Sequence, residues 1–311
     1  MGRPGGEVGP GGEVGGPHAP AARSLPPEGA HPALGRPGGG VGGPHAPTAR
    51  SLAPEGAHPA LGRPGGGVGA LIMAGGRISR YGGVDTLRGL AVLWMMSFHF
   101  SFDLNWFGFI HTDFYTSPWW LDQRIAIVSL FVFTVGLTQT FTDASGRPAR
   151  HFWKRWAQIV GASLLVTAGS YAAFPHSFIY FGILQGIAAM LLLHRLVFRH
   201  FGAWVLLLAP IAIAAPQLWG HAFFNPPWWN WTGLITQKPI TEDYAPLLPW
   251  IGVLWIGAGA GWLLARVQFR PLRHLPEIRP LSFLGRWPLT IYLLHQPVFV
   301  GLVWLAAHLR G

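Results

Sequence analysis

The sequence predicts an all-α protein, a polytopic membrane bundle of about seven transmembrane helices. Half of its 311 residues are hydrophobic and only 11% are charged, whereas a soluble domain has roughly 25% charged residues. The apolar residues also gather in long runs, each near the ~20 residues that a helix needs to cross a ~30 Å hydrocarbon core. Composition and run length together indicate that the chain is surrounded by membrane lipids.

The first 72 residues do not share this pattern. GGPHAP at 15–20 recurs at 42–47, and AHPALGRP at 30–37 recurs at 57–64. These repeats contain almost no large apolar side chains, so stacked copies would bury too little surface to offset chain entropy. We therefore expect residues 1–72 to be disordered. We also expect Met73 to be the natural start of a transmembrane domain at 73–311, because no apolar signal-peptide core precedes it.

Basic residues are concentrated in every second connection between the apolar runs. The seven runs lie at 87–106, 120–141, 153–173, 177–197, 202–219, 247–265 and 288–308. Arginine and lysine precede the first run, separate the second from the third, follow the fourth and separate the sixth from the seventh, whereas the connections 105–118 and 174–177 contain none. The positive-inside rule therefore predicts a cytoplasmic N-terminus and an external C-terminus.

Composition also excludes several classes of function. The chain has no cysteine, which removes disulfides, Cys-ligated zinc and a thiol nucleophile. Its formal net charge of +10 comes largely from arginines that flank the apolar runs, and we assign these to membrane orientation rather than to nucleic-acid binding. We find no P-loop, dinucleotide-binding turn or His-Glu-x-x-His helix, so we predict no bound metal.

The first run contains ionisable residues on one helical stripe. Arg88, His99 and Asp103 are eleven and four residues apart, which returns each to nearly the same face of a helix and sets His99 about 16 Å beyond Arg88. Ionisable groups at membrane depth usually face a cavity or a partner. His99 and Asp103 could instead pair only to hold helices together. His111 follows in the loop just beyond this stripe and is a further candidate.

The last run contains a second polar group. Tyr292, His295 and Gln296 are adjacent to Pro297, which removes one backbone hydrogen bond from the helix. These side chains either line a polar cavity or satisfy the opened backbone, and the sequence supports both interpretations equally. Gln185 is a single polar residue in the fourth run, and we include it among the candidate cavity residues.

Glycine and acidic residues occur in the sixth run and in the loop before it. Gly257, Gly259 and Gly261 are spaced so that a neighbouring helix can approach closely, and packing alone explains them. Glu242 and Asp243 lie in the tryptophan-rich loop 220–246. This acidic pair either meets an acceptor substrate or belongs only to the surface.

Five motifs occur in the order found in a known family. They are DTLRGLAV at 85–92, FHFSFDL at 98–104, FGILQ at 181–185, PLLPW at 246–250 and LGRWPLTIYLLHQP at 284–297. With these motifs, residues 77–307 resemble the bacterial membrane proteins related to the catalytic domain of heparan-α-glucosaminide N-acetyltransferase. The spacing of Arg88 and His99 is also similar to that in the wider group of transmembrane acyltransferases.

The resemblance implies an enzyme of the bacterial inner membrane that transfers an acyl group, most simply acetyl, from cytoplasmic acyl-CoA to an acceptor outside. The acceptor would be an amine or hydroxyl group, as on a sugar. Arg88, Arg147 and Arg150 would contact the donor's phosphates. Acetyl-CoA or another acyl-CoA is then a donor substrate, and the expected partners are this donor, a sugar-like acceptor and membrane lipids.

The resemblance also implies a histidine in the reaction. His99 or His111 would act as general base or as a transient acyl carrier, and Asp103 would orient the imidazole. The eukaryotic transferase has an essential histidine in the outer loop after its first catalytic span, and His111 occupies that place here.

Two other functions remain open from the residues alone. Intramembrane His and Asp side chains also relay protons in transporters, and a fifth run interrupted by Pro210 and Pro216 suits a discontinuous helix of a transporter or a lipid-linked-sugar flippase. A non-catalytic membrane scaffold would use the same polar groups for helix contacts.

Overall fold

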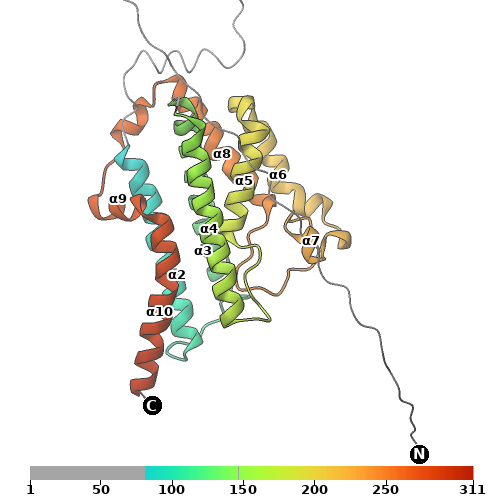
Figure 1. The fold of residues 1–311 in the computed structure, drawn as a ribbon, viewed down its shortest axis with the longest axis vertical. Helices are drawn as coiled ribbons and strands as arrows, with labels where there is room; N and C mark the ends of the chain where they lie inside the picture. Colours follow the sequence, from blue (N-terminus) through green and yellow to red (C-terminus); the bar gives the residue numbers. More distant parts are fainter. Residues whose placement is uncertain (1–80, 146, 311) are drawn as a thin grey trace, which may run out of the picture. The chain divides into compact units, whose positions relative to one another are not determined.

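The computed structural model describes residues 81–145 and 147–310, and every regular element in these two segments is helical (Figure 1). The predicted all-α class is therefore confirmed. The repeats at 1–72 and Met73 lie outside the described residues.

Each of the seven predicted apolar runs coincides with a helix. The long helices are α2 (Gly82–Trp106), α3 (Pro118–Ala144), α4 (Ala149–Ala173), α5 (Ile183–Leu196), α6 (Val205–Trp219), α8 (Leu247–Arg266) and α10 (Pro288–Arg310). The short helices are η1 (Phe198–Trp204), η2 (Ala222–Phe224), α7 (Pro227–Asn230), η3 (Arg270–His274) and α9 (Arg279–Arg286).

Four helical segments of the described chain are long and apolar enough to cross a membrane. They are Pro118–Ala144, Phe198–Trp219, Leu247–Arg266 and Pro288–Arg310. The predicted count of about seven spans is therefore not confirmed. The fourth run shows one reason, because residues 177–182 are not helical in the structure and leave an α5 of only 14 residues.

Helices α3 and α8 form the centre of the bundle and approach each other at glycines. A Cβ atom added to Gly257 would lie 2.1 Å from the carbonyl oxygen of Phe133, and one added to Gly136 would lie 2.1 Å from that of Leu254. The Thr140 hydroxyl donates to the carbonyl of Ala258 across the same interface. The structure thus supports the packing interpretation of the glycines in the sixth run.

We expect Gly257→Ala to lower the free energy of unfolding by about 1–3 kcal/mol, because the new methyl group must push α3 away from α8. Gly301→Ala is the matched control, since a Cβ atom at Gly301 meets no atom within 4 Å and alanine favours the helix. Thermal unfolding in detergent measures both variants. Equal melting temperatures for the two would contradict this account of the interface.

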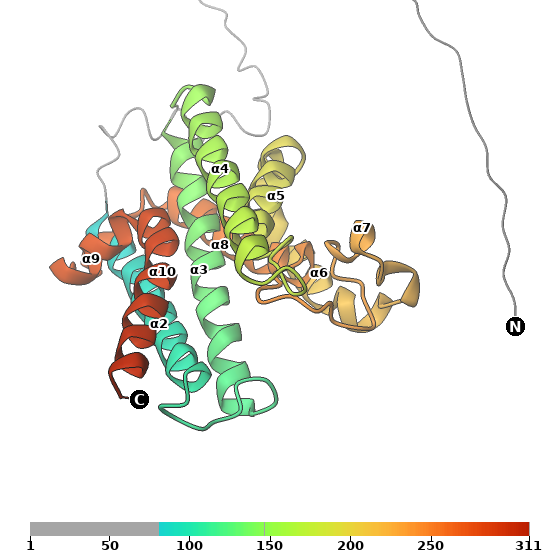
Figure 2. The same ribbon diagram turned by 60° about the horizontal axis from the view of Figure 1, so that its bottom comes forward.

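Helix α2 packs along the C-terminal segment of the chain. Its first half contacts α9, where a Cβ atom at Gly89 would lie 1.8 Å from the carbonyl oxygen of Leu281. Its second half runs beside α10, as Figures 1 and 2 show. The stripe of the first run therefore faces residues 279–310, although those residues are almost 200 positions away in sequence.

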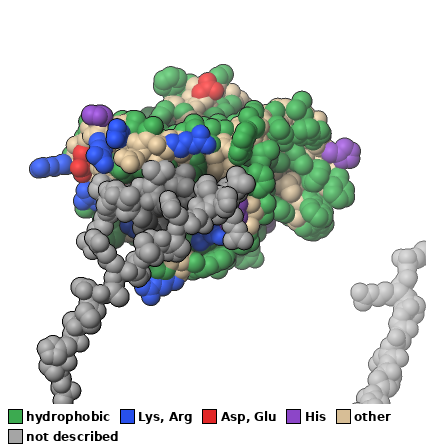
Figure 3. Space-filling view, turned by 90° about the horizontal axis from the view of Figure 1, so that it is seen from above, with side chains coloured by type: hydrophobic (Ala, Val, Ile, Leu, Met, Phe, Trp, Pro, Cys, Tyr) green, Lys and Arg blue, Asp and Glu red, His purple; other side chains and the backbone are tan. Residues whose placement is uncertain are grey.

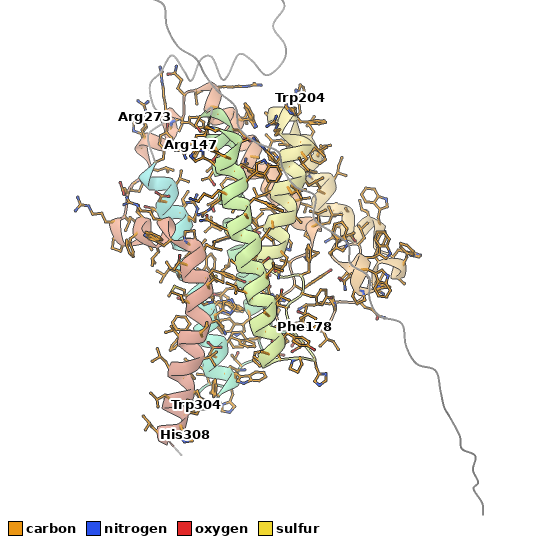
Figure 4. All side chains as sticks on the ribbon, in the orientation of Figure 1. Arg147, Phe178, Trp204, Arg273, Trp304 and His308 are labelled. Atoms are coloured by element: carbon orange, nitrogen blue, oxygen red, sulfur yellow. The ribbon has the colours of Figure 1, made fainter. Side chains whose placement is uncertain are left out.

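Many basic side chains lie at one end of the described body. Lysine and arginine gather on the end seen in Figure 3. Arg147 and Arg273 lie at this end in Figure 4, whereas Phe178, Trp304 and His308 lie at the opposite one. The positive-inside rule predicts that such a basic end faces the cytoplasm, and this orientation stays a prediction.

Candidate functional site

Helices α2 and α10 bring two pairs of polar residues together inside an otherwise apolar contact. The rings of His99 and His295 lie with their centroids 5.1 Å apart at an interplanar angle of 63°. One turn further along α2, the Asp103 carboxylate accepts a hydrogen bond of 2.9 Å from Nε2 of Gln296. Asp103 and His295 are both buried. We call these four residues the α2–α10 cluster.

The backbone fixes the protonation pattern of the His295 ring. Its Nδ1 lies 2.8 Å from the carbonyl oxygen of Tyr292 and 3.2 Å from that of Ile291. A carbonyl oxygen only accepts, so Nδ1 must be the protonated nitrogen and a neutral ring then has its lone pair on Nε2. The carbonyl freed by Pro297 is that of Leu293, four residues earlier. His295 therefore does not satisfy the backbone group that the proline opens.

Three acceptor atoms of the cluster are buried without a hydrogen-bond partner. They are Oδ2 of Asp103, Oε1 of Gln296 and Nε2 of His295. Leaving a buried polar atom unsatisfied costs about 1–3 kcal/mol, and three such atoms within roughly one helical turn are unusual. All three accept hydrogen bonds, so together they suit a ligand that donates several.

Asp103 and His99, which we expected to interact with each other, each contact a residue of α10 instead. The carboxylate bonds to Gln296, while the half-buried His99 packs against the His295 ring. Phe299 lies beside the cluster, with its ring 5.3 Å from Phe100 and 6.0 Å from His295. The cluster is thus a contact of two helices, with aromatic rings along one of its sides.

His111 lies outside this cluster. It is exposed in the loop between α2 and α3, whereas the His99 ring packs against that of His295. Nearby, Asp113 accepts hydrogen bonds from the Thr116 hydroxyl and from the backbone N–H groups of Thr116 and Tyr115. These bonds, led by that of the Thr116 hydroxyl, lower the pKa of Asp113.

Arg88 has protein partners in the place where we expected donor phosphates. Its guanidinium lies 3.2 Å from the Asp85 carboxylate and donates to the carbonyl oxygen of Gly285 at 3.1 Å. Both ionic side chains are largely buried, with 15% and 6% exposure. Arg88 therefore joins α2 to α9.

Gln185 and Tyr292, two of the predicted cavity residues, lie in different parts of the bundle. The Gln185 amide accepts from the N–H of Gly182 and donates to Ser163 and Thr167, so it caps α5 and ties it to α4. Tyr292 lies next to the cluster, with its ring 5.7 Å from that of His295. Of these two predicted cavity residues, only Tyr292 adjoins the cluster.

The two loop carboxylates, for which the sequence left acceptor contact and a surface position both open, join neighbouring segments. Asp243 accepts a 2.7 Å hydrogen bond from the N–H of Ile183 at the start of α5. Burial raises the pKa of Asp243 despite that bond. Glu242 accepts from the Ser177 hydroxyl. These contacts join the loop 231–246 to the turn before α5.

A second polar feature is a cavity of about 290 Å³ at the arginine-rich end. Arg147 lines it, whereas Arg150 is exposed and does not. Its other charged lining residues are Asp143, Arg195 and Arg199. The sequence indicated Arg195 and Arg199, the basic residues after the fourth run, only as determinants of membrane orientation, and their position beside Arg147 is known only from the structure. We call this cavity the basic pocket.

Comparison with known proteins gives one match. Residues 80–297 match the family described as heparan-alpha-glucosaminide N-acetyltransferase, catalytic. Neither the curated proteins nor the solved structures include a match. The matched segment contains all four residues of the α2–α10 cluster and all four charged residues of the basic pocket.

Proposed function

Because this integral membrane protein belongs to the heparan-alpha-glucosaminide N-acetyltransferase catalytic family, we propose that it transfers an acetyl group from acetyl-CoA to the amine of an amino sugar. The family description names an acetyl transfer to a glucosaminide, which supports both the acyl group and the acceptor class. We place the enzyme in a bacterial inner membrane with its arginine-rich end in the cytoplasm, in agreement with the positive-inside rule.

The observation behind the acceptor assignment is the set of three unpartnered acceptors in the α2–α10 cluster. An amine donates two hydrogens when neutral and three when protonated, while a hydroxyl group donates one. Asp103, Gln296 and His295 offer three acceptor atoms. Binding of an amine would therefore satisfy atoms that otherwise destabilise the fold, and a hydroxyl acceptor would leave most of them unsatisfied.

The proposed reaction forms an amide and breaks a thioester. The amine nitrogen attacks the thioester carbonyl, a histidine takes the proton that the nitrogen loses, and the sulfur leaves and is protonated to the CoA thiol. His99 is our first candidate for this base, since it belongs to the cluster and its ring packs against that of His295. His111, exposed in the adjacent loop, is the second. Either imidazole could alternatively accept the acetyl group transiently.

The donor is proposed to enter at the arginine-rich end. Arg147 supplies a guanidinium there, and guanidinium groups bind phosphate through paired charge-assisted hydrogen bonds. Arg150 is exposed at the same end of α4, and we propose that it attracts the donor's phosphates as the donor approaches. Arg88 is less suited to this contact because Asp85 and Gly285 already engage it.

The test is acetyl transfer by the purified full chain in proteoliposomes. We expect radiolabelled acetyl-CoA to acetylate glucosamine and to leave N-acetylglucosamine, whose amine is blocked, unmodified. Equal labelling of both sugars would show a hydroxyl acceptor. If folded protein labels neither sugar but moves one of them across the membrane, the transporter alternative replaces this proposal.

A further inference from the structure

The basic pocket lies where three segments distant in sequence meet. Its lining comes from the end of α3, the start of α4, the end of α5 with η1, and Trp262 of α8. The charged lining residues are three arginines, Arg147, Arg195 and Arg199, and a single carboxylate, Asp143. Three positive charges therefore face one negative charge, and the pocket has a net excess of two positive charges.

Asp143 is an incompletely satisfied anion inside this pocket. Its Oδ1 forms an ion pair with Arg195 at 2.5 Å and accepts from Nε2 of Gln139 at 3.2 Å. Its Oδ2 is buried without a hydrogen-bond partner. Arg195 also lies over the ring of Phe152, 5.0 Å from its centroid, so the guanidinium is held in place even when its carboxylate partner changes.

We propose that the basic pocket binds a phosphate ester, and that Asp143 is an internal anion which the phosphate partly displaces from Arg195. A phosphate monoester carries about −1.5 to −2 charges near neutral pH, which matches the excess of two positive charges. This inference rests on the proposed function to the extent that the phosphates are those of the acyl-CoA donor.

Pocket size and lining favour the phosphorylated end of a soluble donor. About 290 Å³ is at the lower limit of pockets for whole small molecules, so the pocket would hold a headgroup while the remainder of the ligand extends beyond it. Trp262 and Phe152 add aromatic surface to the lining. An anionic lipid headgroup offers similar chemistry, and binding measured in nanodiscs of defined lipid composition separates the two.

The proposal predicts opposite effects for two variants. Arg199→Gln removes a positive charge that lines the pocket, and we expect it to weaken binding about tenfold or more. Asp143→Asn removes the competing anion, and we expect it to tighten binding severalfold. A purely structural role of the Asp143–Arg195 ion pair would make Asp143→Asn weaken binding instead.

The experiment measures binding of adenosine 3′,5′-bisphosphate to the detergent-purified full chain by equilibrium dialysis. Arg273→Gln is the matched control, because Arg273 is exposed at the same end of the molecule (Figure 4) and does not line the pocket. We expect it to change affinity less than twofold. Arg195→Gln is tested only together with Asp143→Asn, so that no buried carboxylate loses its partner.

Each outcome decides the proposal. Tighter binding by Asp143→Asn with weaker binding by Arg199→Gln supports it. Weaker binding by Asp143→Asn, or equal losses in Arg199→Gln and Arg273→Gln, overturns it. Loss of probe binding in nanodiscs of phosphatidylglycerol but not of phosphatidylcholine would identify a lipid site and also overturn it. The probe has no acyl group, so normal probe binding without acetyl transfer would refute the proposed function alone.

Discussion

Replacing His99 with glutamine is expected to lower the rate of acetyl transfer by about 10²- to 10⁴-fold, the range that a general base contributes. Glutamine keeps a polar side chain of similar length but cannot accept the proton that the attacking amine loses. His99 contacts the His295 ring, whose position is fixed by two backbone carbonyls. The substitution should therefore change the chemistry more than the packing, and kcat should fall more than KM rises.

Two further variants make this experiment decisive. His176→Gln is the matched control, since His176 is exposed in the turn before α5, and its rate should equal that of the unmodified chain. His111→Gln tests the second candidate base. A large loss in His111→Gln with an unchanged rate in His99→Gln would transfer the role of base to the loop. Unchanged rates in both would remove histidine base catalysis from the proposal.

The local features of the fold could be predicted from sequence because they depend on neighbouring residues. A run such as 247–265 is apolar over the length of a membrane span, and it forms α8 at nearly the same bounds. The run at 177–197 was misread in its first residues because Phe178 and Tyr180 are as apolar as helix residues. These aromatic residues lie in an irregular segment that is hydrogen-bonded to residues 241–245.

The candidate residues of the α2–α10 cluster were found in the sequence, but their pairing was not. His99 and Asp103 belong to one stripe by helical periodicity, and His295 and Gln296 are adjacent. The bond between Asp103 and Gln296 joins residues 193 positions apart, and no pattern in a single sequence specifies that contact. The same limit applies to the basic pocket, which needs Arg147 and Arg195 from separate helices.

Arg88 shows which part of a side chain's surroundings a helical pattern does not predict. Its place ahead of His99 on the stripe indicated a functional residue, and an arginine at the end of a membrane helix suits a phosphate. The structure instead places its guanidinium between the Asp85 carboxylate and the backbone of Gly285. Periodicity predicts which face a side chain occupies, whereas the partner on that face comes from tertiary packing.

Arg88→Met is therefore expected to lower the free energy of unfolding by about 3 kcal/mol, because it removes a largely buried ion pair with Asp85 and the hydrogen bond to Gly285. Thermal unfolding in detergent measures the loss. The double variant Asp85→Asn with Arg88→Met should recover part of it, since it removes both charges.

The same variant separates a structural role from donor binding. If Arg88 only joins α2 to α9, folded Arg88→Met protein should bind CoA with an affinity within about twofold of the unmodified chain, below the tenfold change that loss of a charge-assisted hydrogen bond produces. An unchanged melting temperature together with a tenfold weaker affinity would reverse this assignment and restore Arg88 as a phosphate contact. Because stability and affinity are measured on the same protein, each role predicts a different pair of results.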